Sequence, residues 1–409
     1  MRYLFLHTNF PAQWRHIAAA LALQPENEVV FATTNPRGSI PGVKKVLFKA
    51  HREVRKETHH YVRGLEYAVL NGQGVYRALA PLKAQGFQPD VIGAHSGWGT
   101  GQFVKDLFPD AGFLGYFEWY YKGRGSDADF IGDRPMSDDD HLRLRSKNAP
   151  IVLDLVNCDW GLSPTGFQRS QFPEIFHPKM SVLHDGVDTN FFVPDPNARL
   201  KIKDLDLSHV DEIITYVARG MEPYRGFPQF MEALSKLQRM RPNLHAVIIG
   251  ADRVAYGTKL EDGRTYKQKA LDELDLDQDR IHFTGLLPYP DYLRCVQAAK
   301  AHVYLTVPFV LSWSMIETMS AGALLVASDT EPVREVIEDG VNGLLVDFFD
   351  TDQIAARLNE AVERYDDYAS IRAMARETAL DRYALNDSLP KLMKLLDCVA
   401  RRDFPPKLD

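Results

Sequence analysis

Residues 307–321 (VPFVLSWSMIETMSA) contain the strongest chemical signal of the chain. Their pattern predicts that a strand ends near Pro308 and that a helix begins near Ser314. Backbone N–H groups at the start of a helix, together with the helix dipole, suit a diphosphate. The spacing of Ser314 and Glu317 is typical of a capping box, in which Glu317 would bind a backbone N–H group. Alternatively, the Glu317 carboxylate binds two hydroxyls of a sugar, and one rotamer cannot do both.

Two arginines, Arg219 and Arg225, lie in a loop that follows the predicted strand 212–218. Parallel sheets bind ligands at the carboxyl ends of their strands, where two arginines can neutralise a diphosphate. Loop arginines are more commonly just exposed, so this pair alone is weak evidence.

His95 stands at the end of another predicted strand, 90–94. A lone histidine is more often structural than functional, but this position is on the side where open α/β sheets bind ligands. The glycines that follow it would let the backbone approach a ligand closely; they are Gly97, Gly99 and Gly101.

Short apolar runs alternate with helical patterns along the whole chain, which favours parallel sheets covered on both faces. The predicted strands are 2–7, 28–33, 90–94, 112–117, 181–184, 212–218, 244–249, 281–284, 301–307, 324–328 and 343–346. The predicted helices are 14–23, 69–85, 228–240, 266–274, 289–299, 314–321, 332–338 and a final set over 352–400, interrupted at 386–390. The sequence therefore predicts two doubly wound α/β domains, joined by a polar linker over residues 193–209.

The length of 409 residues suits about two domains. A net charge of -7 argues against a general nucleic-acid binder. The first apolar run is too short for a signal peptide, and no segment approaches the roughly 18 apolar residues of a membrane span. We therefore expect a cytoplasmic protein.

The segment from Arg37 to Arg63 is strongly basic, with eight Lys or Arg, three His and two acidic residues. A solvated surface is the ordinary explanation for such a charge run. The alternative is a contact with an anionic partner, either a phosphate group or the inner face of a membrane.

Several blocks of the second half occur in the order and spacing of a known family. They are the two-arginine loop, Thr284-Gly285, Glu317-Thr318-Met319-Ser320-Ala321-Gly322, Glu335-Val336-Ile337, Asp339-Gly340 and Asn342-Gly343-Leu344-Leu345-Val346. They resemble the retaining glycosyltransferases of family four (glycosyl transferases group 1) over about residues 180–350; the first half matches in pattern more than in motif. The resemblance implies the GT-B fold, with two facing Rossmann-like domains and a cleft between them.

The resemblance also implies roles for single residues. Arg219 matches the family's loop arginine and Arg225 replaces its usual lysine, so both would bind the donor diphosphate and stabilise the departing nucleotide. Glu317 matches the second of two family glutamates, which holds the ribose hydroxyls. His95 matches a histidine that faces the donor sugar, so its expected role is a hydrogen bond to that sugar or an interaction with the positive centre that develops on it, and not zinc binding.

The first of the two family glutamates would fall at residue 309, which is Phe309 here. This change leaves the recognition of the donor sugar open, since Phe309 either stacks on an apolar sugar face or packs inside the protein. The backbone amides of Val310, Leu311 and Ser312 would still bind phosphate or sugar hydroxyls.

On the acceptor side, the loop with Asn9 and Gln13 takes the place of the family's glycine-rich first loop but lacks its glycines. Trp98 and Glu118 complete the expected acceptor side; Glu118 has aromatic neighbours whose faces suit sugar rings. A half-buried strand end explains Glu118 equally well.

Two acidic clusters need another explanation. Asp127-Ala128-Asp129 has the Asp-x-Asp spacing of metal-dependent glycosyltransferases with a different fold, but such short matches are frequent by chance. Asp138-Asp139-Asp140 is typical of an acidic loop or a helix start. We therefore expect no metal and no other cofactor.

Together these features predict a retaining glycosyltransferase. Residues 210–384 would hold a UDP-, GDP- or ADP-sugar, and residues 1–192, with a returning helix at about 385–409, would hold a sugar, glycolipid or polysaccharide acceptor. The implied mechanism is front-face substitution, in which the departing phosphate helps to take the acceptor's proton. The alternative is a catalytically silent GT-B protein that only binds nucleotide-sugars. A nicotinamide dehydrogenase is disfavoured, because no G-x-G-x-x-G follows a predicted strand.

Overall fold

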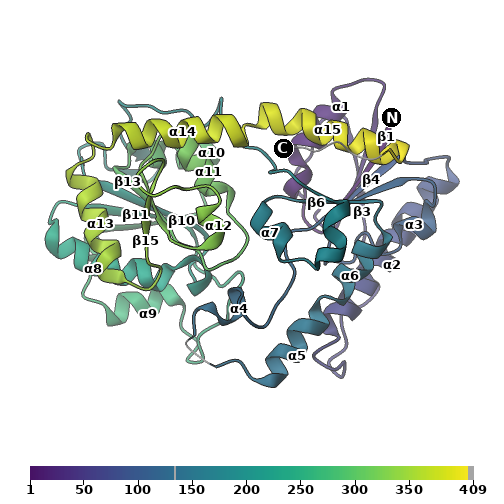
Figure 1. Cartoon of the computed structure of the whole chain (residues 1–409), viewed down its shortest axis with the longest axis horizontal. Coiled ribbons are helices and arrows are strands. Elements are labelled where there is room, and N and C mark those ends of the chain that lie inside the picture. The colour runs from purple at the N-terminus through teal and green to yellow at the C-terminus, as the bar shows by residue number, and fades with distance from the viewer. Residues whose placement is uncertain (133–134, 404–409) are drawn as a thin grey trace. The chain divides into compact units, whose positions relative to one another are not determined.

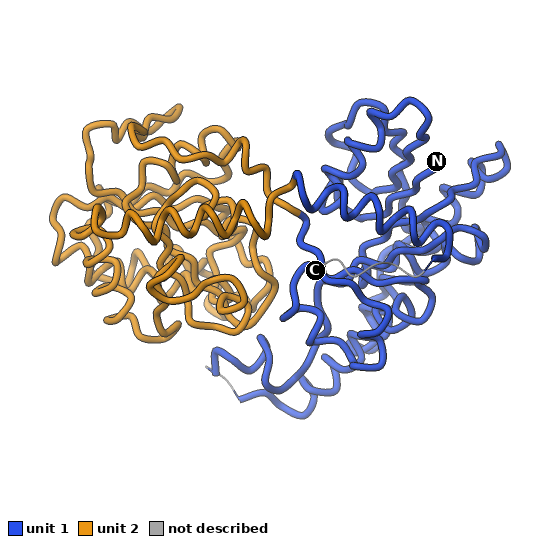
Figure 2. Tube along the Cα trace, turned by 45° about the horizontal axis from the view of Figure 1, so that its top comes forward, with its two compact units in different colours: residues 1–185, 386–409 blue, residues 186–385 orange. Residues whose placement is uncertain are grey.

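The computed structural model describes residues 1–132 and 135–403, and the chain forms two compact units (Figures 1 and 2). Unit 1 comprises Met1–Asp185 and Asn386–Asp409, and unit 2 comprises Gly186–Leu385. The chain therefore passes between the units twice.

Unit 1 is built on a parallel sheet in the order β3-β2-β1-β4-β5-β6-β7. Its strands are β1 (Arg2–Leu6), β2 (Glu28–Thr33), β3 (Val43–Leu47), β4 (Val91–His95), β5 (Gly112–Tyr116), β6 (Trp160–Ser163) and β7 (Met180–Val182). The order reverses between β1 and β4, so the carboxyl ends of these two strands flank the switch point where open α/β sheets bind ligands.

Helices cover both faces of this sheet, because side chains alternate along each strand. In β1, Leu4 and Leu6 belong to one core and Tyr3 and Phe5 to the other. The first core includes α2 (Arg63–Ala84), α3 (Val104–Leu107) and α6 (Ala149–Asn157); the second includes α1 (Arg15–Ala22) and α15 (Leu385–Arg401). The remaining helices of unit 1 are η1 (Ala12–Trp14), α4 (Asp127–Phe130), α5 (Asp138–Lys147), α7 (Gly166–Ser170) and η2 (Glu174–Lys179).

Unit 2 repeats the design with a parallel sheet in the order β12-β11-β10-β13-β14-β15. Its strands are β10 (Ile213–Gly220), β11 (His245–Ala251), β12 (Ile281–Gly285), β13 (Ala301–Tyr304), β14 (Leu325–Ser328) and β15 (Leu344–Val346). Here the switch point lies between β10 and β13, which places the two-arginine loop and the loop of residues 305–312 beside each other.

The helices of unit 2 also lie on both faces of its sheet. One face packs on α10 (Tyr289–Ala298), α11 (Trp313–Ser320) and α14 (Ala369–Tyr383). On the other face, Tyr216 of β10 stacks on Phe230 of α8 (Phe227–Met240), with ring centroids 4.8 Å apart. The others are η3 (Pro223–Arg225), α9 (Tyr266–Glu273), η4 (Gln278–Arg280), α12 (Glu331–Arg334) and α13 (Thr351–Glu363).

The strand and helix pattern that the sequence predicts agrees with the structure in outline. The sequence does not predict β6 or the helices α3, α4, α6 and α7 of unit 1, and three further points differ. The sequence gives no sign of β3, because lysines interrupt its apolar run; the strand lies at the sheet edge, where lysine is common. The expected linker 193–209 lies inside unit 2, where it forms the hairpin of β8 (Lys201–Ile202) and β9 (Leu205–Asp206) with Leu200 and Leu207 buried in the core. The last two helices separate at the extended residue Ala384, and Pro390 lies within α15.

Candidate functional site

The loop after β10 carries Arg225 into the interior of unit 2. The Glu222 carbonyl accepts hydrogen bonds from the N–H groups of Arg225 and Phe227, both at 3.2 Å. Gly226 has φ +61°, and a Cβ there would lie 2.4 Å from Leu305 Cβ, so only glycine allows this loop to approach β13 so closely. As a result, Arg225 lies at the switch point with only 6% of its surface exposed.

The Arg225 guanidinium is held by neutral oxygen atoms. It donates to Thr306 Oγ1 at 2.7 Å and to the Val310 carbonyl at 2.9 Å. Its carbon lies 5.5 Å from the ring centroid of Tyr256 and 5.8 Å from that of Phe309. Among the described residues it forms no ion pair, although buried charges are usually paired. A permanently charged guanidinium in such surroundings suits an anionic ligand.

Arg219 differs from Arg225 because it is exposed at the end of β10. It makes no hydrogen bond or ion pair within residues 1–132 and 135–403. Both arginines thus belong to the same sheet edge, and neither is neutralised by a carboxylate of the described chain.

The start of α11 excludes the interpretation of Glu317 as a helix cap. The N-cap of this helix is Ser312, whose side chain accepts from the Ser314 N–H group, and the third helical residue is Met315. Ser314 and Glu317 therefore do not form the capping box that their spacing suggests. Glu317 is instead buried, with 7% exposed, and faces α10, where burial and the Glu317 carboxylate raise the pKa of Tyr292 well above its usual range.

The loop of residues 309–312 is largely packed. Phe309 is 8% exposed and meets the rings of Tyr224 and Tyr256 edge-on, with centroids 5.4 and 5.2 Å apart. Leu311 belongs to the core, while the Ser312 N–H group donates to Tyr304 Oη at 2.8 Å. Of the two explanations for Phe309, the packing contacts favour a residue that packs inside the protein.

Glu222 organises this site but is not among the residues that the sequence singles out. It is fully buried, and its carboxylate accepts hydrogen bonds from the N–H groups of Tyr256 at 2.9 Å and Gly257 at 2.8 Å. It thereby ties the loop after β10 to the loop after β11. Its partners are backbone groups more than thirty residues away, so no local pattern could reveal them.

A second polar cluster lies at the switch point of unit 1. His95 ends β4, and its Nε2 atom is 3.3 Å from Oε2 of Glu118, which follows β5. Gln13, from the loop after β1, donates to Glu118 Oε1 at 2.7 Å. The structure thus brings together three of the predicted residues, His95, Glu118 and Gln13.

The other expected residues of unit 1 lie differently. The Asn9 N–H group donates to Nδ1 of His7 at 2.7 Å, and the His7 ring packs edge-on against His95, 4.8 Å between centroids. His7 is thus a further member of the cluster. It directly follows β1, just as His95 ends β4, so its position at the end of an apolar run could have indicated it. Trp98 is 45% exposed, and its carbonyl accepts a hydrogen bond from Asn71 of α2.

Two of the glycines after His95 serve packing rather than the approach of a ligand. A Cβ at Gly99 would lie 2.0 Å from the Ala68 carbonyl oxygen of α2. A Cβ at Gly101 would lie 2.7 Å from the Phe113 ring. The expectation for these two positions is therefore corrected, whereas Gly97 has φ +89° and only Ile151 within 4 Å.

The two acidic clusters begin helices. Asp129 forms a capping box with Ser126 at the start of α4, and Asp140 forms one with Ser137 at the start of α5. In the part of the chain that the structure describes, no three His, Cys, Asp or Glu side chains gather into a group that could hold a metal ion.

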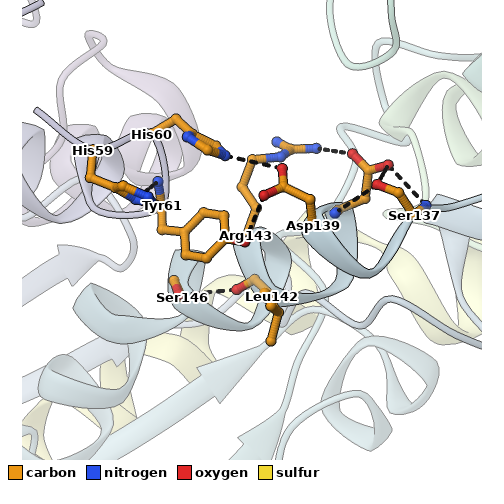
Figure 3. Close-up of polar contacts among 9 residues, drawn as sticks. His59, His60, Tyr61, Ser137, Asp139, Leu142, Arg143 and Ser146 are labelled. Carbon is orange, nitrogen blue, oxygen red and sulfur yellow. Dashed lines mark hydrogen bonds and ion pairs between the residues drawn. The ribbon is translucent and has the colours of Figure 1, made fainter. Parts of the chain in front are cut away.

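The basic segment contacts the acidic start of α5 (Figure 3). Asp139 accepts hydrogen bonds from Tyr61 Oη at 2.7 Å and His60 Nε2 at 3.0 Å. Most other cations of the segment are exposed; they are Arg37, Lys44, Lys49, His51, Arg55, Lys56, His59 and Arg63. Across residues 1–132 and 135–403, none of the helices has both the length and the apolar character that crossing a membrane requires.

Comparison with solved structures defines the class of the protein. The Anabaena protein HepE in complex with UDP matches with a TM-score of 0.68 at 17% identity, over 97% of this chain and 100% of that chain. Two doubly wound parallel units in one chain, together with this match, define the fold as GT-B.

Family models then identify the chain more narrowly. The "Glycosyl transferase family 4 group" model matches residues 25–192, and the "Glycosyl transferases group 1" model matches residues 198–378. The chain therefore belongs to the group 1 glycosyltransferases of family four, as the sequence motifs indicate.

Two curated relatives match part of the chain. A GDP-mannose-dependent alpha-(1-6)-phosphatidylinositol monomannoside mannosyltransferase of Mycolicibacterium smegmatis is 25% identical over 56% of this chain, and a lipopolysaccharide 1,2-N-acetylglucosaminetransferase of Salmonella typhimurium is 23% identical over 54%. The aligned part spans 60% of the length of each relative.

Proposed function

We propose that the protein is a retaining glycosyltransferase, which moves a sugar from a nucleotide-diphosphate-sugar to an acceptor hydroxyl. The observation that carries this proposal is Arg225: a buried guanidinium at the switch point of unit 2, held by neutral oxygen atoms and by no carboxylate of the described chain. The diphosphate of the donor would provide the negative charge that pairs with Arg225. Membership of the family supports sugar transfer as the reaction.

Donor binding would involve residues from two loops and from helix α11 of unit 2. Arg219 and Arg225 bind the diphosphate and stabilise the charge that develops on the departing nucleotide. Glu317 binds the ribose hydroxyls, since its carboxylate is not used as a helix cap. Backbone amides of the loop that includes Val310 and Leu311 add donors for phosphate or sugar oxygens.

The transfer itself would proceed by front-face substitution. The acceptor oxygen forms its bond to the anomeric carbon on the side from which the phosphate leaves, so the configuration is retained. The bond between that carbon and the phosphate oxygen breaks, and the phosphate takes the proton of the acceptor hydroxyl. His95 binds the donor sugar, and Asn9, Gln13, Trp98 and Glu118 form the acceptor side; no metal is required.

The acceptor class is a sugar, a glycolipid or a polysaccharide. The names of the two relatives refer to a phosphatidylinositol mannoside and a lipopolysaccharide, which supports an acceptor at a membrane surface. The exposed cations between Arg37 and Arg63 suit peripheral contact with anionic lipids at the inner face of the membrane. Sedimentation with anionic vesicles should fall as salt rises; sedimentation that ignores both salt and lipid charge would exclude this contact.

A second candidate function is nucleotide-sugar binding without transfer. The packing of Phe309 against Tyr224 and Tyr256 favours it, because residue 309 then offers no carboxylate to a donor sugar. This candidate predicts the same nucleotide binding but no product with any acceptor.

The donor site can be tested by thermal unfolding with UDP, GDP, ADP and their sugars. One nucleotide series should raise the melting temperature of the wild type, because a ligand that binds only the folded state stabilises it. Arg225→Gln and the exposed variant Arg219→Ala should each lose most of this shift, whereas Arg239→Ala, on the exposed side of α8, should keep it. A full shift in Arg225→Gln, or no shift with any nucleotide in the wild type, would refute the donor site.

A further inference from the structure

Glu118 is fixed in place by contacts on both sides of its carboxylate. Gln13 donates to Oε1 at 2.7 Å, and Oε2 lies 3.3 Å from His95 Nε2. The backbone carbonyl of Glu118 also accepts a hydrogen bond from Gln168 Nε2 at 2.9 Å. The His95 side chain is 6% exposed and the Glu118 side chain 29%, so solvent screens this pair only in part.

The hydrogen bonds of His95 determine its protonation. Its Nδ1 atom lies 2.9 Å from the Ser96 carbonyl, which only accepts, so Nδ1 carries a proton. A neutral ring would then present a lone pair at Nε2 to the Glu118 carboxylate, which is repulsive. A proton on Nε2 makes the ring cationic and the contact attractive. The pKa of His95 agrees: burial alone would lower it, but Glu118 and the Ser96 carbonyl raise it by more.

The groups that pack around His95 are a second histidine, a tyrosine and several acids. The Asn9 N–H group donates to His7 Nδ1, so the neighbouring His7 ring accepts at that atom. Tyr116 of β5 packs 5.3 Å from His95, between ring centroids. Two acids, Glu118 and Asp185, raise the pKa of His95, and His95 in turn acts against the burial that raises the pKa of Asp154.

The Nε2–H group of His95 does not donate a well-aligned hydrogen bond to Glu118. Despite the short distance, no well-aligned hydrogen bond joins the two atoms, and Nε2 has no hydrogen-bond partner among the described residues. The carboxylate therefore favours the charged form of the ring through its short distance, without a well-aligned hydrogen bond to Nε2. A buried, cationic donor in this state can bind an oxygen atom of a ligand strongly.

We propose that Glu118 is a positioning residue that keeps His95 as an imidazolium, whose Nε2–H group binds a sugar oxygen in the transfer reaction. This inference deepens the proposed function and rests on it only for the kinetic result. It adds a role in the charge state of His95 to the place of Glu118 on the acceptor side.

The charge state can be measured without any substrate. In an NMR titration of the full chain, with His95 assigned by comparison with His95→Gln, the His95 ring should lose its proton at a higher pH than an ordinary histidine. Glu118→Gln keeps the size and the contact with Gln13 but removes the charge. It should lower the His95 titration midpoint by at least about one pH unit, because burial then dominates. Glu174→Gln, at an exposed position, serves as the control and should change nothing.

The kinetic test uses the pH profile of transfer. Activity that needs the imidazolium is complete below the His95 pKa and falls as pH rises through it. Glu118→Gln should therefore move the alkaline limb to lower pH, and Glu118→Asp should restore part of the shift. An unchanged His95 midpoint in Glu118→Gln, or a loss of kcat/KM that is equal at every pH, overturns the proposal. A shifted midpoint in a protein that transfers no sugar would instead support the pair and refute the proposed function.

Discussion

Asp154 is a buried carboxyl group of unit 1 that the proposed reaction does not use. It lies on α6 beneath the turn that follows His95, with 1% of its surface exposed. Its Oδ2 atom accepts from Ser96 Oγ at 2.8 Å and the Gly97 N–H group at 3.4 Å, while Oδ1 has no hydrogen-bond partner among the described residues. Burial raises the pKa of Asp154 from 3.8 to about 6.

This shift predicts a pH-dependent effect on stability. Between about pH 4 and pH 6 the folded chain keeps a proton on Asp154 that the unfolded chain releases, so this residue destabilises the fold as pH rises. Asp154→Asn keeps an acceptor for Ser96 and cannot ionise. It should therefore be more stable than the wild type at pH 7.5, by up to about 3 kcal/mol, with little gain near pH 4.

The measurement is urea unfolding of both proteins at several pH values, with the exposed Asp110→Asn as the control. A stability difference between Asp154→Asn and wild type that does not vary with pH would contradict the assignment.

At the scale of residues, the sequence shows which side chains can take part in chemistry, but it does not show which of them the fold buries. Arg219 and Arg225 share one loop, yet the structure exposes the first and buries the second, because Gly226 allows the loop to meet Leu305. Likewise, the spacing of Ser314 and Glu317 suggests a cap, but Ser312 starts the helix and leaves Glu317 inside. Both outcomes depend on contacts with other strands, which no local spacing encodes.

At the scale of elements, the turn after β4 holds His95 by packing on α2. Gly99 has φ +79°, and its position leaves no room for a Cβ next to the Ala68 carbonyl. Gly86, at the end of α2, has a similar φ of +91° but nothing within 4 Å of a Cβ. Both glycines therefore have a positive φ that strains other residues, but only at Gly99 would an added Cβ also clash with another element.

Alanine substitutions at Gly86 and Gly99 therefore distinguish the cost of backbone strain from the cost of a steric clash. Gly86→Ala should cost about 1 kcal/mol of unfolding free energy, because a residue with a Cβ is strained at positive φ. Gly99→Ala should cost well over twice as much, because α2 or the turn must also move. Urea unfolding measures both values; equal losses would show that the turn does not pack on α2 as described.

Among the elements, the alternation of strands and helices can be predicted from the sequence, because it follows from the local periodicity of apolar residues. The unpredictable part depends on tertiary contacts. The segment 193–209 is polar and proline-containing, yet Leu200 and Leu207 anchor it in the core of unit 2. β3 forms despite its lysines, because it pairs with β2 at the edge of the sheet.

At the scale of the whole molecule, each unit is a doubly wound domain with its own core, and the C-terminal helix belongs to the first. α15 buries Leu395, Leu396 and Val399 in unit 1. Its end lies so close to β5 that a Cβ at Gly112 would be 2.2 Å from the Val399 carbonyl oxygen. Arg225 and the His95–Glu118 pair therefore belong to different units, and sugar transfer as proposed requires both.

The most direct test of this account follows the anomeric proton by NMR when the full chain acts on the nucleotide-sugar that stabilises it, with simple sugars and glycolipids as acceptors. From an α-linked donor the account predicts release of the nucleoside diphosphate and a first-formed product that is also α, with both lost in Arg225→Gln. A β product would contradict the retaining mechanism, and a donor that binds but is never consumed, even by slow hydrolysis, would contradict a transferase and leave a nucleotide-sugar-binding protein.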